Sequence, residues 1–319
     1  MSIITRRGAG LAAFAAAALP GAALAQSPAA APAPAPVGFH RFKVGSFTVT
    51  TLFDGTARLN LQGFVGNATL EQVQAVLAES FLPTDHYLTP YTVTVVDTGR
   101  ALVMFDAGTG GQLSPQAGRM AANMAAAGID PARITHVVFT HFHGDHITGL
   151  TTRENAAVFP NAEIVVPEGE WRYWTDRSNE GPAPERQKPN FANTARRFGP
   201  YAGRVRQVQD GQEAVPGIRA VAAPGHSPGH TCYHIADGPA QFMVVGDITH
   251  RPELFARRPD FQVMFDFDPV AAAATRVRML DRIAAERMHV SGYHFPFPAH
   301  GFFAREGNGF RYVPADWAA

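Results

Sequence analysis

The chain of 319 residues has very little cysteine and no excess of charge of either sign. Its single cysteine, Cys232, excludes an intramolecular disulfide, although many exported proteins also have none, so the count does not identify a compartment. Lys plus Arg and Asp plus Glu both number 27, so the chain lacks the basic field that holds a phosphate backbone. The charge balance therefore weighs against nucleic acid as a partner.

The apolar stretch near the N-terminus is too short for a bilayer span and is broken by Pro20 and Gly21. It follows a basic start that contains Arg6 and Arg7, and it ends in the small residues ALA at Ala25. This order is typical of a secretory signal peptide over residues 1–25, with an uncleaved membrane anchor as the alternative. We expect a periplasmic or secreted protein without a membrane segment in its mature form, exported by the Sec or the twin-arginine route.

Residues 26–37 are rich in proline and alanine and resemble a linker with nothing to bury. Residues 38–319 alternate strand and helix patterns without another linker, which predicts a single α/β domain of layered sheets with helices outside. Hairpins are expected around Gly45 and at Thr98–Gly99, and helices over residues 69–81, 112–127 and 268–288. Thr69 and Gln72 have the spacing of a capping box.

The most informative segment is HFHGDH, residues 141–146, which directly follows the apolar run ITHVVFT. Side chains two apart at the end of a strand point to the same side, so His141 and His143 can bind one metal ion. Gly144 lets the backbone turn and brings Asp145 and His146 to the same cavity. Imidazole nitrogen and carboxylate oxygen suit zinc and neighbouring transition metals. One ion does not need four such ligands, so the segment predicts two ions side by side.

Three later segments supply the remaining ligands of such a site. His226 lies in APGHSPGH, Asp247 follows an apolar strand in VVGDITH, and His294 follows another in SGYHFPFP. His289 and His300 are nearby alternatives to His294. We predict that Asp247 bridges the ions together with a water-derived hydroxide, and that each ion keeps the open position a catalytic site requires. The ligands of the first ion are then His141, His143 and His226, and those of the second are Asp145, His146 and His294.

The sequence resembles the metallo-β-lactamase superfamily over residues 39–319. HxHxDH at 141–146, PGHSPGH at 224–230, GD at 246–247 and the histidine of GYHFPFP carry this resemblance. It implies an αββα sandwich with metals at one sheet edge. FHRFKVGSFTVTTLFDGT, FDAGTGG at 105–111 and REGNGFRYVPADW resemble the methyl parathion hydrolase branch in particular. That branch implies an exported homodimer with two metal ions that hydrolyses phosphotriesters, lactones or aryl esters.

Residues around the ions receive supporting roles. Asp106 in FDAG is expected to orient a metal ligand through a hydrogen bond, and His230 to lie just behind the ligands or in the core. Asp145 and Asp247 are the expected catalytic carboxylates, placed to hold hydroxide or to transfer a proton.

Aromatic residues gather at EWRYWTD and shortly after it. By the family resemblance, Trp174 and Phe191 line an aromatic leaving-group pocket, with Trp171 beside them as a further substrate-binding residue. The alternative is that these rings pack in the core beneath a loop. An apolar, aromatic mouth suits a neutral ester, lactone or triester better than a charged phosphodiester.

The predicted function is metal-dependent hydrolysis with two divalent ions, zinc first and Mn²⁺, Co²⁺ or Fe²⁺ as alternatives. A metal-bridging hydroxide attacks the ester, lactone or phosphotriester, so no serine or cysteine nucleophile is required. The alternatives are a β-lactamase, a lactonase acting on acyl-homoserine lactones, a nuclease, and a metal-binding or sensing protein without turnover. Neutrality and export disfavour the nuclease, and Asp145 next to His146 fits the true β-lactamases less well.

Overall fold

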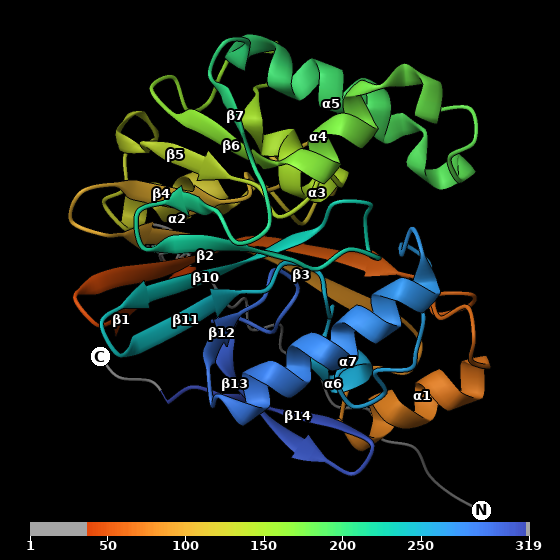
Figure 1. Cartoon of the computed structure of the whole chain (residues 1–319). Coiled ribbons are helices and arrows are strands. Elements are labelled where there is room, and N and C mark those ends of the chain that lie inside the picture. Colours follow the sequence, from red (N-terminus) through yellow and green to blue (C-terminus); the bar gives the residue numbers. More distant parts are fainter. Residues whose placement is uncertain (1–36, 317–319) are drawn as a thin grey trace, which may run out of the picture. The chain divides into compact units, whose positions relative to one another are not determined.

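The structure is a computed structural model that describes residues 37–316. The predicted signal peptide and residues 26–36 of the predicted linker lie outside the described residues. Within residues 37–316, two seven-stranded mixed sheets pack face to face, and helices cover their outer faces (Figure 1). This confirms the predicted αββα sandwich.

The first sheet is antiparallel over its first four strands and parallel over the rest, where helices cross from strand to strand. Its strands, in spatial order, are β1 (Phe39–Val44), β2 (Phe47–Leu59), β3 (Tyr87–Asp97), β4 (Leu102–Phe105), β5 (His136–Val138), β6 (Glu163–Pro167) and β7 (Val205–Val208). The helices that follow strands of this sheet are α1 (Leu70–Glu79), α2 (Met120–Ala126), α3 (Gly144–Ile147), α4 (Glu168–Thr175) and α5 (Pro189–Phe198). Single turns of 3₁₀ helix are η1 (Pro131–Arg133), η2 (Thr148–Leu150), η3 (Arg177–Asn179), η4 (Glu185–Gln187) and η5 (Gly199–Tyr201).

The second sheet has the spatial order β14-β13-β12-β11-β10-β9-β8 and is antiparallel except for the pair β11 and β12. Its strands are β8 (Glu213–Val215), β9 (Ile218–Ala222), β10 (Thr231–Asp237), β11 (Ala240–Val244), β12 (His289–Ser291), β13 (His300–Glu306) and β14 (Gly309–Pro314). The parallel pair needs a crossover, which α6 (Pro252–Phe255) and the long helix α7 (Pro269–Ala285) provide.

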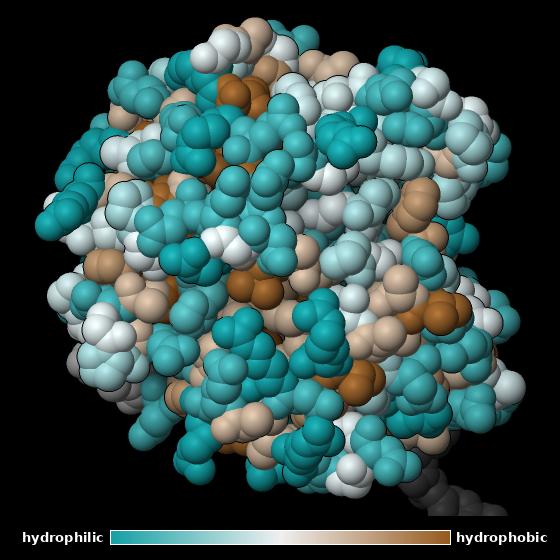
Figure 2. Space-filling model, in the orientation of Figure 1, coloured by the Kyte–Doolittle hydropathy of each residue, from teal (hydrophilic) through white to brown (hydrophobic). Residues whose placement is uncertain are grey.

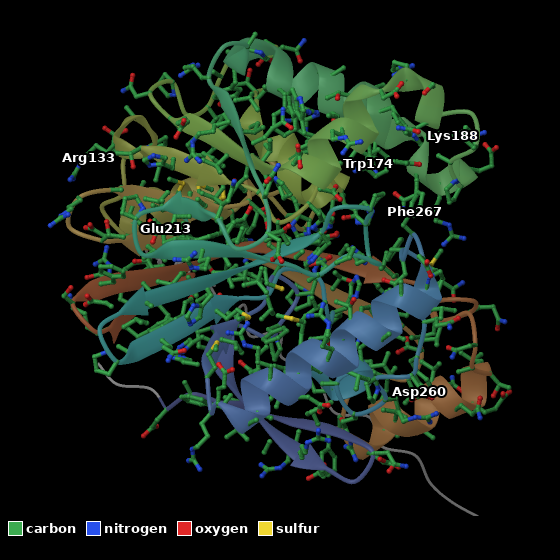
Figure 3. The ribbon with its side chains drawn as sticks, viewed as in Figure 1. Arg133, Trp174, Lys188, Glu213, Asp260 and Phe267 are labelled. Carbon is green, nitrogen blue, oxygen red and sulfur yellow. The ribbon has the colours of Figure 1, made fainter. Side chains whose placement is uncertain are left out.

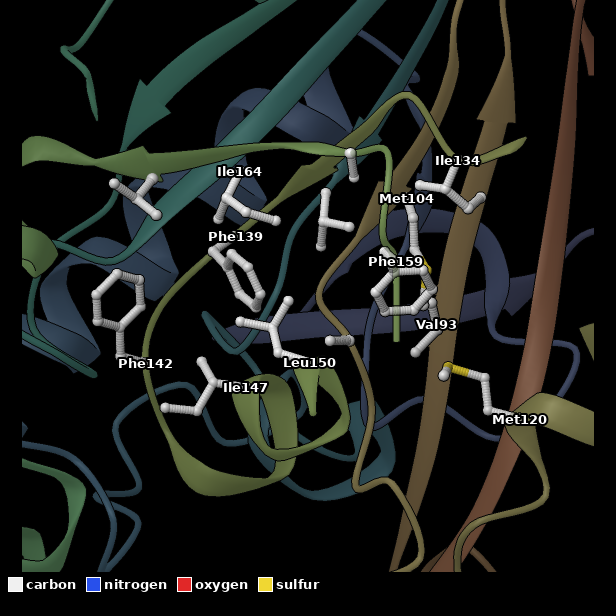
Figure 4. Packing of buried hydrophobic residues seen from close by; sticks show 14 of the residues in the cluster. Val93, Met104, Met120, Ile134, Phe139, Phe142, Ile147, Leu150, Phe159 and Ile164 are labelled. Atoms are coloured by element: carbon white, nitrogen blue, oxygen red, sulfur yellow. The ribbon is translucent and has the colours of Figure 1, made fainter. Parts of the chain in front are cut away.

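The core has a separate apolar layer for each interface. Val103, Val138 and Phe242 belong to the layer between the sheets, and Figure 4 shows the layer between the first sheet and its helices. A third layer lies between the second sheet and α7.

The face of the molecule shown in Figure 2 is mostly hydrophilic, with apolar residues in small groups. Within residues 37–316, no helix is both long enough and apolar enough to cross a membrane.

Most predicted elements are present, and the capping box is confirmed. Thr69 Oγ1 accepts a hydrogen bond from Gln72 N at 3.3 Å, and Gln72 Oε1 accepts one from Thr69 N at 2.8 Å. The helix predicted over 112–127 is shorter, because the Asp54 carboxylate accepts hydrogen bonds from the amides of Gly118 and Met120 and holds the preceding residues in a loop. The positive φ of 100° at Gly118 also interrupts a helix there. Helix α5 and the strands β7, β8, β13 and β14 were not predicted.

Candidate metal centre

The predicted ligands come from four segments that each follow a strand. His141 and His143 lie in the loop between β5 and α3, past the strand end where the sequence places them. The chain turns into α3 directly after His143, so this short helix carries Asp145 and His146. The other three ligands follow β9, β11 and β12, and they are His226, Asp247 and His294. Residues far apart in sequence therefore meet in one place.

Asp247 lies at the middle of the predicted ligands. Its Oδ2 atom is 3.0 Å from Nε2 of His294, 3.4 Å from Nε2 of His226 and 3.5 Å from Nε2 of His146. Nε2 of His141 is 3.9 Å from the same oxygen. One carboxylate oxygen facing several imidazole nitrogens has the arrangement expected of a bridging ligand.

The two predicted ligand sets are both present as clusters. The candidate ligand atoms within each set lie within 4.8 Å of one another. Asp145 Oδ2 is 3.4 Å from Nε2 of His294 and 3.7 Å from Nε2 of His146, which completes the second set. The first cluster is His141, His143 and His226, and the second is Asp145, His146 and His294. A further cluster, His141, His146 and Asp247, joins the two.

Unpartnered buried atoms show that the cluster fits metal ions. Among the described residues, five candidate ligand atoms are buried without a hydrogen-bond partner, and they are Oδ1 of Asp247 and Nε2 of His141, His143, His146 and His226. Each buried polar atom left unpaired costs about 1–3 kcal/mol, so five in one place need a partner of another kind. Imidazole nitrogen with carboxylate oxygen suits zinc and its neighbours, and the residues therefore fit two divalent ions.

The other ring nitrogen of several ligands is anchored, which directs Nε2 toward the cluster. When Nδ1 carries the proton and donates it, the lone pair of Nε2 is free to bind a metal. Asp106, which the sequence predicts in this role, accepts from His146 at 2.8 Å and also from the amide and hydroxyl of Thr140. The remaining acceptors are Asp266 for His226 at 2.8 Å, the carbonyl of Pro90 for His294 at 2.8 Å and the Thr140 hydroxyl for His141 at 3.1 Å.

A comparison with protein families gives a match over residues 87–288 to the model described as the metallo-beta-lactamase superfamily. The chain belongs to the metallo-beta-lactamase superfamily. This confirms the resemblance seen in the sequence. A comparison with curated proteins gives no match.

Solved structures of superfamily proteins share the fold. AidC, a dizinc quorum-quenching lactonase in complex with the product N-hexanoyl-L-homoserine, is 25% identical, with a TM-score of 0.83 over 88% of this chain and 99% of that one. The hydrolase AbOPH is 24% identical, with a TM-score of 0.83 over 89% of this chain and 99% of that one. A probable metal-dependent hydrolase from Staphylococcus aureus is 22% identical, with a TM-score of 0.73 over 87% and 100%.

Two effects, burial and the charges of neighbouring groups, shift the pKa values of the residues in this centre. Burial and neighbouring histidines hold the pKa of His141 and His143 well below 6.5. For His226, burial is outweighed by the carboxylates of Asp247 and Asp266, which raise its pKa to about 9. Burial also works against the charge of Asp247, but His294 and His146 hold its pKa well below the usual value. A metal ion that binds here must therefore displace protons, as metal ligands generally require.

His250 is a residue of the site that the sequence interpretation missed. Its Nε2 lies 3.6 Å from Asp247 Oδ2, and its ring stacks on His294 with centroids 5.1 Å apart and planes 5° apart. Its Nδ1 is buried without a partner among the described residues. His226, Asp247 and His250 form a further cluster that could hold a metal ion. The signal was available, because His250 follows Asp247 by three residues in the same loop.

The other histidines considered from the sequence have different positions. His230 Nε2 accepts a hydrogen bond from the Asp247 amide at 3.0 Å and so supports Asp247 from behind. His289 and His300 lie on β12 and β13, away from the ligand clusters, and a hydrogen bond of 2.8 Å joins their rings. His40 stacks on His300 with centroids 4.9 Å apart. Burial lowers the pKa of His289 to about 4 and that of His300 to about 3.

We expect the pair of His289 and His300 to make stability depend on pH. Both imidazoles are neutral in the folded protein, whereas near pH 6 the unfolded chain binds more protons. Their contribution to the free energy of unfolding is therefore complete above pH ~6.5 and is lost as the pH falls toward ~4. Urea unfolding of chelator-treated protein at pH 7 and pH 5 tests this. The double variant His289→Gln, His300→Gln should show a smaller difference between the two pH values, and an unchanged difference would contradict the assignment.

A pocket with a volume of about 280 Å³ opens over the ligand cluster. Leu59, Tyr91, Leu113 and Phe265 supply its apolar wall. The polar part of the lining consists of Arg186, Gln187, Asn190 and Thr89, together with His143, Gly144, Asp145, His226, Asp247, His250 and His294 at the centre. The site thus combines a floor of candidate metal ligands with a small and mostly apolar mouth.

The aromatic residues predicted to bind substrate do not line this pocket. Trp174 (Figure 3) and Phe191 are 1% and 0% exposed, and their rings pack on each other with centroids 4.9 Å apart. Trp171 packs edge-on against Phe142 and Phe198. The core placement, left open as the alternative, is the one observed, because the face of α4 that bears Trp174 turns into the protein. Tyr91 and Phe265 provide the aromatic wall instead.

Proposed function

We propose that the protein is a hydrolase with two divalent metal ions, most favourably zinc, that opens small neutral lactones. Esters of similar size, including aryl esters and organophosphate triesters, are further substrates. The observation that carries the proposal is the ligand cluster around Asp247 Oδ2 on the floor of the small pocket. The similarity to a dizinc lactonase supports the choice of lactones.

The residues of the site have separable tasks in such a reaction. Two bound ions supply Lewis acidity and lower the pKa of water. Asp247, which is 2% exposed, holds the ligand histidines of both sets in one arrangement. The Asp145 side chain is 21% exposed and faces the pocket, so its carboxylate can exchange a proton with a bound substrate. The hydroxyl of Tyr293 donates to the Asp145 carbonyl at 2.7 Å and fixes the backbone there.

The pocket favours neutral substrates of limited size. Its volume lies below the ~300–1,000 Å³ typical of sites that enclose a drug-sized ligand, so the scissile ring enters while a longer substituent extends through the mouth. Arg186 is the one lysine or arginine among its lining residues, which is too little positive charge to bind a polyanion.

Export to the periplasm and a homodimer are proposals from the sequence. N-terminal sequencing of exported material would test the first, and sedimentation would test the second.

A substrate panel on the zinc-loaded protein tests the proposed function. It should contain an N-acylated lactone, the open-chain ester of the same acid, an aryl phosphotriester and the β-lactam nitrocefin. We expect the highest kcat/KM for the lactone and a value at least ~100-fold lower for the β-lactam, because the pocket discriminates by shape around the reacting group. Preference for nitrocefin would favour a β-lactamase. No turnover on any substrate with both ions bound would favour a metal-binding protein.

A further inference from the structure

Glu170 is a fully buried carboxylate beside the metal centre that takes no part in the chemistry above. It lies in the first turn of α4 and is 0% exposed. Four hydrogen-bond donors point at its two oxygens, and all four are neutral N–H or O–H groups. A buried carboxylate with this many donors has a defined position, because moving it would leave several of them unpaired.

Two of the four donors bind the same oxygen of Glu170. One comes from the loop that carries His141 and His143, and the other comes from α4 itself. Oε2 accepts from the amide of Phe142 at 3.0 Å and from Nε1 of Trp174 at 2.7 Å. Phe142 lies between His141 and His143 in the sequence, so anchoring its amide fixes the backbone position of both ligands. One oxygen of Glu170 thus holds the first loop.

The other oxygen holds the loop that carries His226. Oε1 accepts from the amide of Gly229 at 2.6 Å and from the hydroxyl of Ser227, the residue after His226. Ser227 lies in a G-x-S-x-G sequence, but it is 0% exposed and its hydroxyl donates to Glu170, so it is not placed as a nucleophile. A Cβ atom at Gly229 would lie 2.2 Å from the Glu170 amide, so this loop packs directly on the backbone of α4.

We propose that Glu170 is the positioning residue for the ion held by His141, His143 and His226. The three ligands come from two loops, one after β5 and one after β9, and a hydrogen bond of 3.0 Å from the Thr231 amide to the Thr140 carbonyl joins the ends of these loops. Glu170 joins them, with one carboxylate oxygen on each loop, and so sets the spacing that brings the three Nε2 atoms together. This inference rests on the two-ion centre of the proposed function.

Glu170→Gln is the decisive variant because glutamine keeps the shape but has only one acceptor oxygen. Whichever way the amide is turned, its NH₂ group faces the backbone N–H of Phe142 or that of Gly229. One loop therefore loses its anchor. Trp174→Phe is the matched control, since it removes a donor to Glu170 from the same buried place and leaves both loop contacts intact.

Zinc stoichiometry by elemental analysis and zinc affinity by chelator competition are the readouts, with circular dichroism to verify folding. We expect two ions in the wild type and in Trp174→Phe. In Glu170→Gln, one ion should bind ~10–100-fold more weakly, the size usual for losing a group that orients metal ligands. Unchanged affinity for both ions in Glu170→Gln, or an equal loss in Trp174→Phe, would overturn the assignment.

A second background identifies which ion is affected. His226→Ala removes a ligand of the first ion only, so adding Glu170→Gln to it should leave the affinity of the remaining ion unchanged. A further loss there would contradict a role confined to the first ion. If Glu170→Gln does not fold, Ser227→Ala removes one of the donors on the His226 side and should weaken the same ion by a smaller factor. A wild type that binds no ion refutes the two-ion centre itself, which is distinguishable from a failure confined to Glu170.

Discussion

Asp247→Asn is expected to lower kcat/KM for the lactone by on the order of 10³-fold, about 4 kcal/mol of transition-state stabilisation, while the protein stays folded. Asp247 Oδ2 is the atom that faces ligands of both sets, at 3.0 Å from His294 and 3.4 Å from His226. An asparagine amide has no charge to compensate two cations and presents an NH₂ group to ring nitrogens. The residue lies in a loop after β11 and outside the apolar layers, so the sandwich does not depend on it.

Steady-state kinetics with elemental analysis of the same samples measures this effect. Asp260→Asn is a suitable control, since Asp260 (Figure 3) is an exposed carboxylate whose partner is Arg258 at 2.8 Å. The control should retain both ions and normal turnover. Turnover of Asp247→Asn close to that of the wild type, with fewer ions bound, would rule out the central role of this carboxylate.

Removing the metal ions should abolish activity and lower thermal stability together. We expect a fall in turnover on the order of 10³-fold, because no described side chain replaces the ions in activating water. Ions present at about 100 times their Kd add about 2.7 kcal/mol per site to the free energy of unfolding, so the melting temperature should fall by several degrees. The loss of partners for the buried Nε2 atoms is the physical cause.

Re-addition of single metals makes this test specific. Zinc, cobalt or manganese should restore activity, whereas magnesium and calcium should not, since the ligand set is dominated by imidazole nitrogen and those ions prefer oxygen. Thermal unfolding and kinetics on the chelated and reloaded protein are the measurements. Full activity in chelated material that contains no transition metal would refute the metal-dependent function.

The ligands could be predicted from the sequence because each carries a local signal. His141, His143 and His146 stand within one short motif, and Asp247 follows an apolar strand. Parts of the site without such a signal were missed. Asp266 is 40 residues from His226, and Glu170 is 28 residues from Phe142 and 59 from Gly229. Nothing in the sequence around an acidic residue of a helix or loop indicates which distant residue it will contact in the fold.

The aromatic residues illustrate the opposite failure. Trp171 and Trp174 are visible as a cluster, and both outcomes, a pocket wall or a core, fit the spacing. Only the packing of α4 decides between them, and it turns Trp174 inward toward Phe191. Leu113 and Phe265, which do line the pocket, belong to segments with no distinguishing pattern.

The sequence by itself predicted the layered fold and the seven residues that gather in the candidate metal centre, because periodicity and short motifs are local properties that the chain retains before it folds. The tertiary structure decided that Asp266 and Glu170 support the ligand loops beside the predicted Asp106, that His250 lies with the ligands, and which side chains line the pocket. Those features are contacts between segments distant along the chain, and their energy exists only once the two sheets have packed and burial has selected one partner for each buried polar atom.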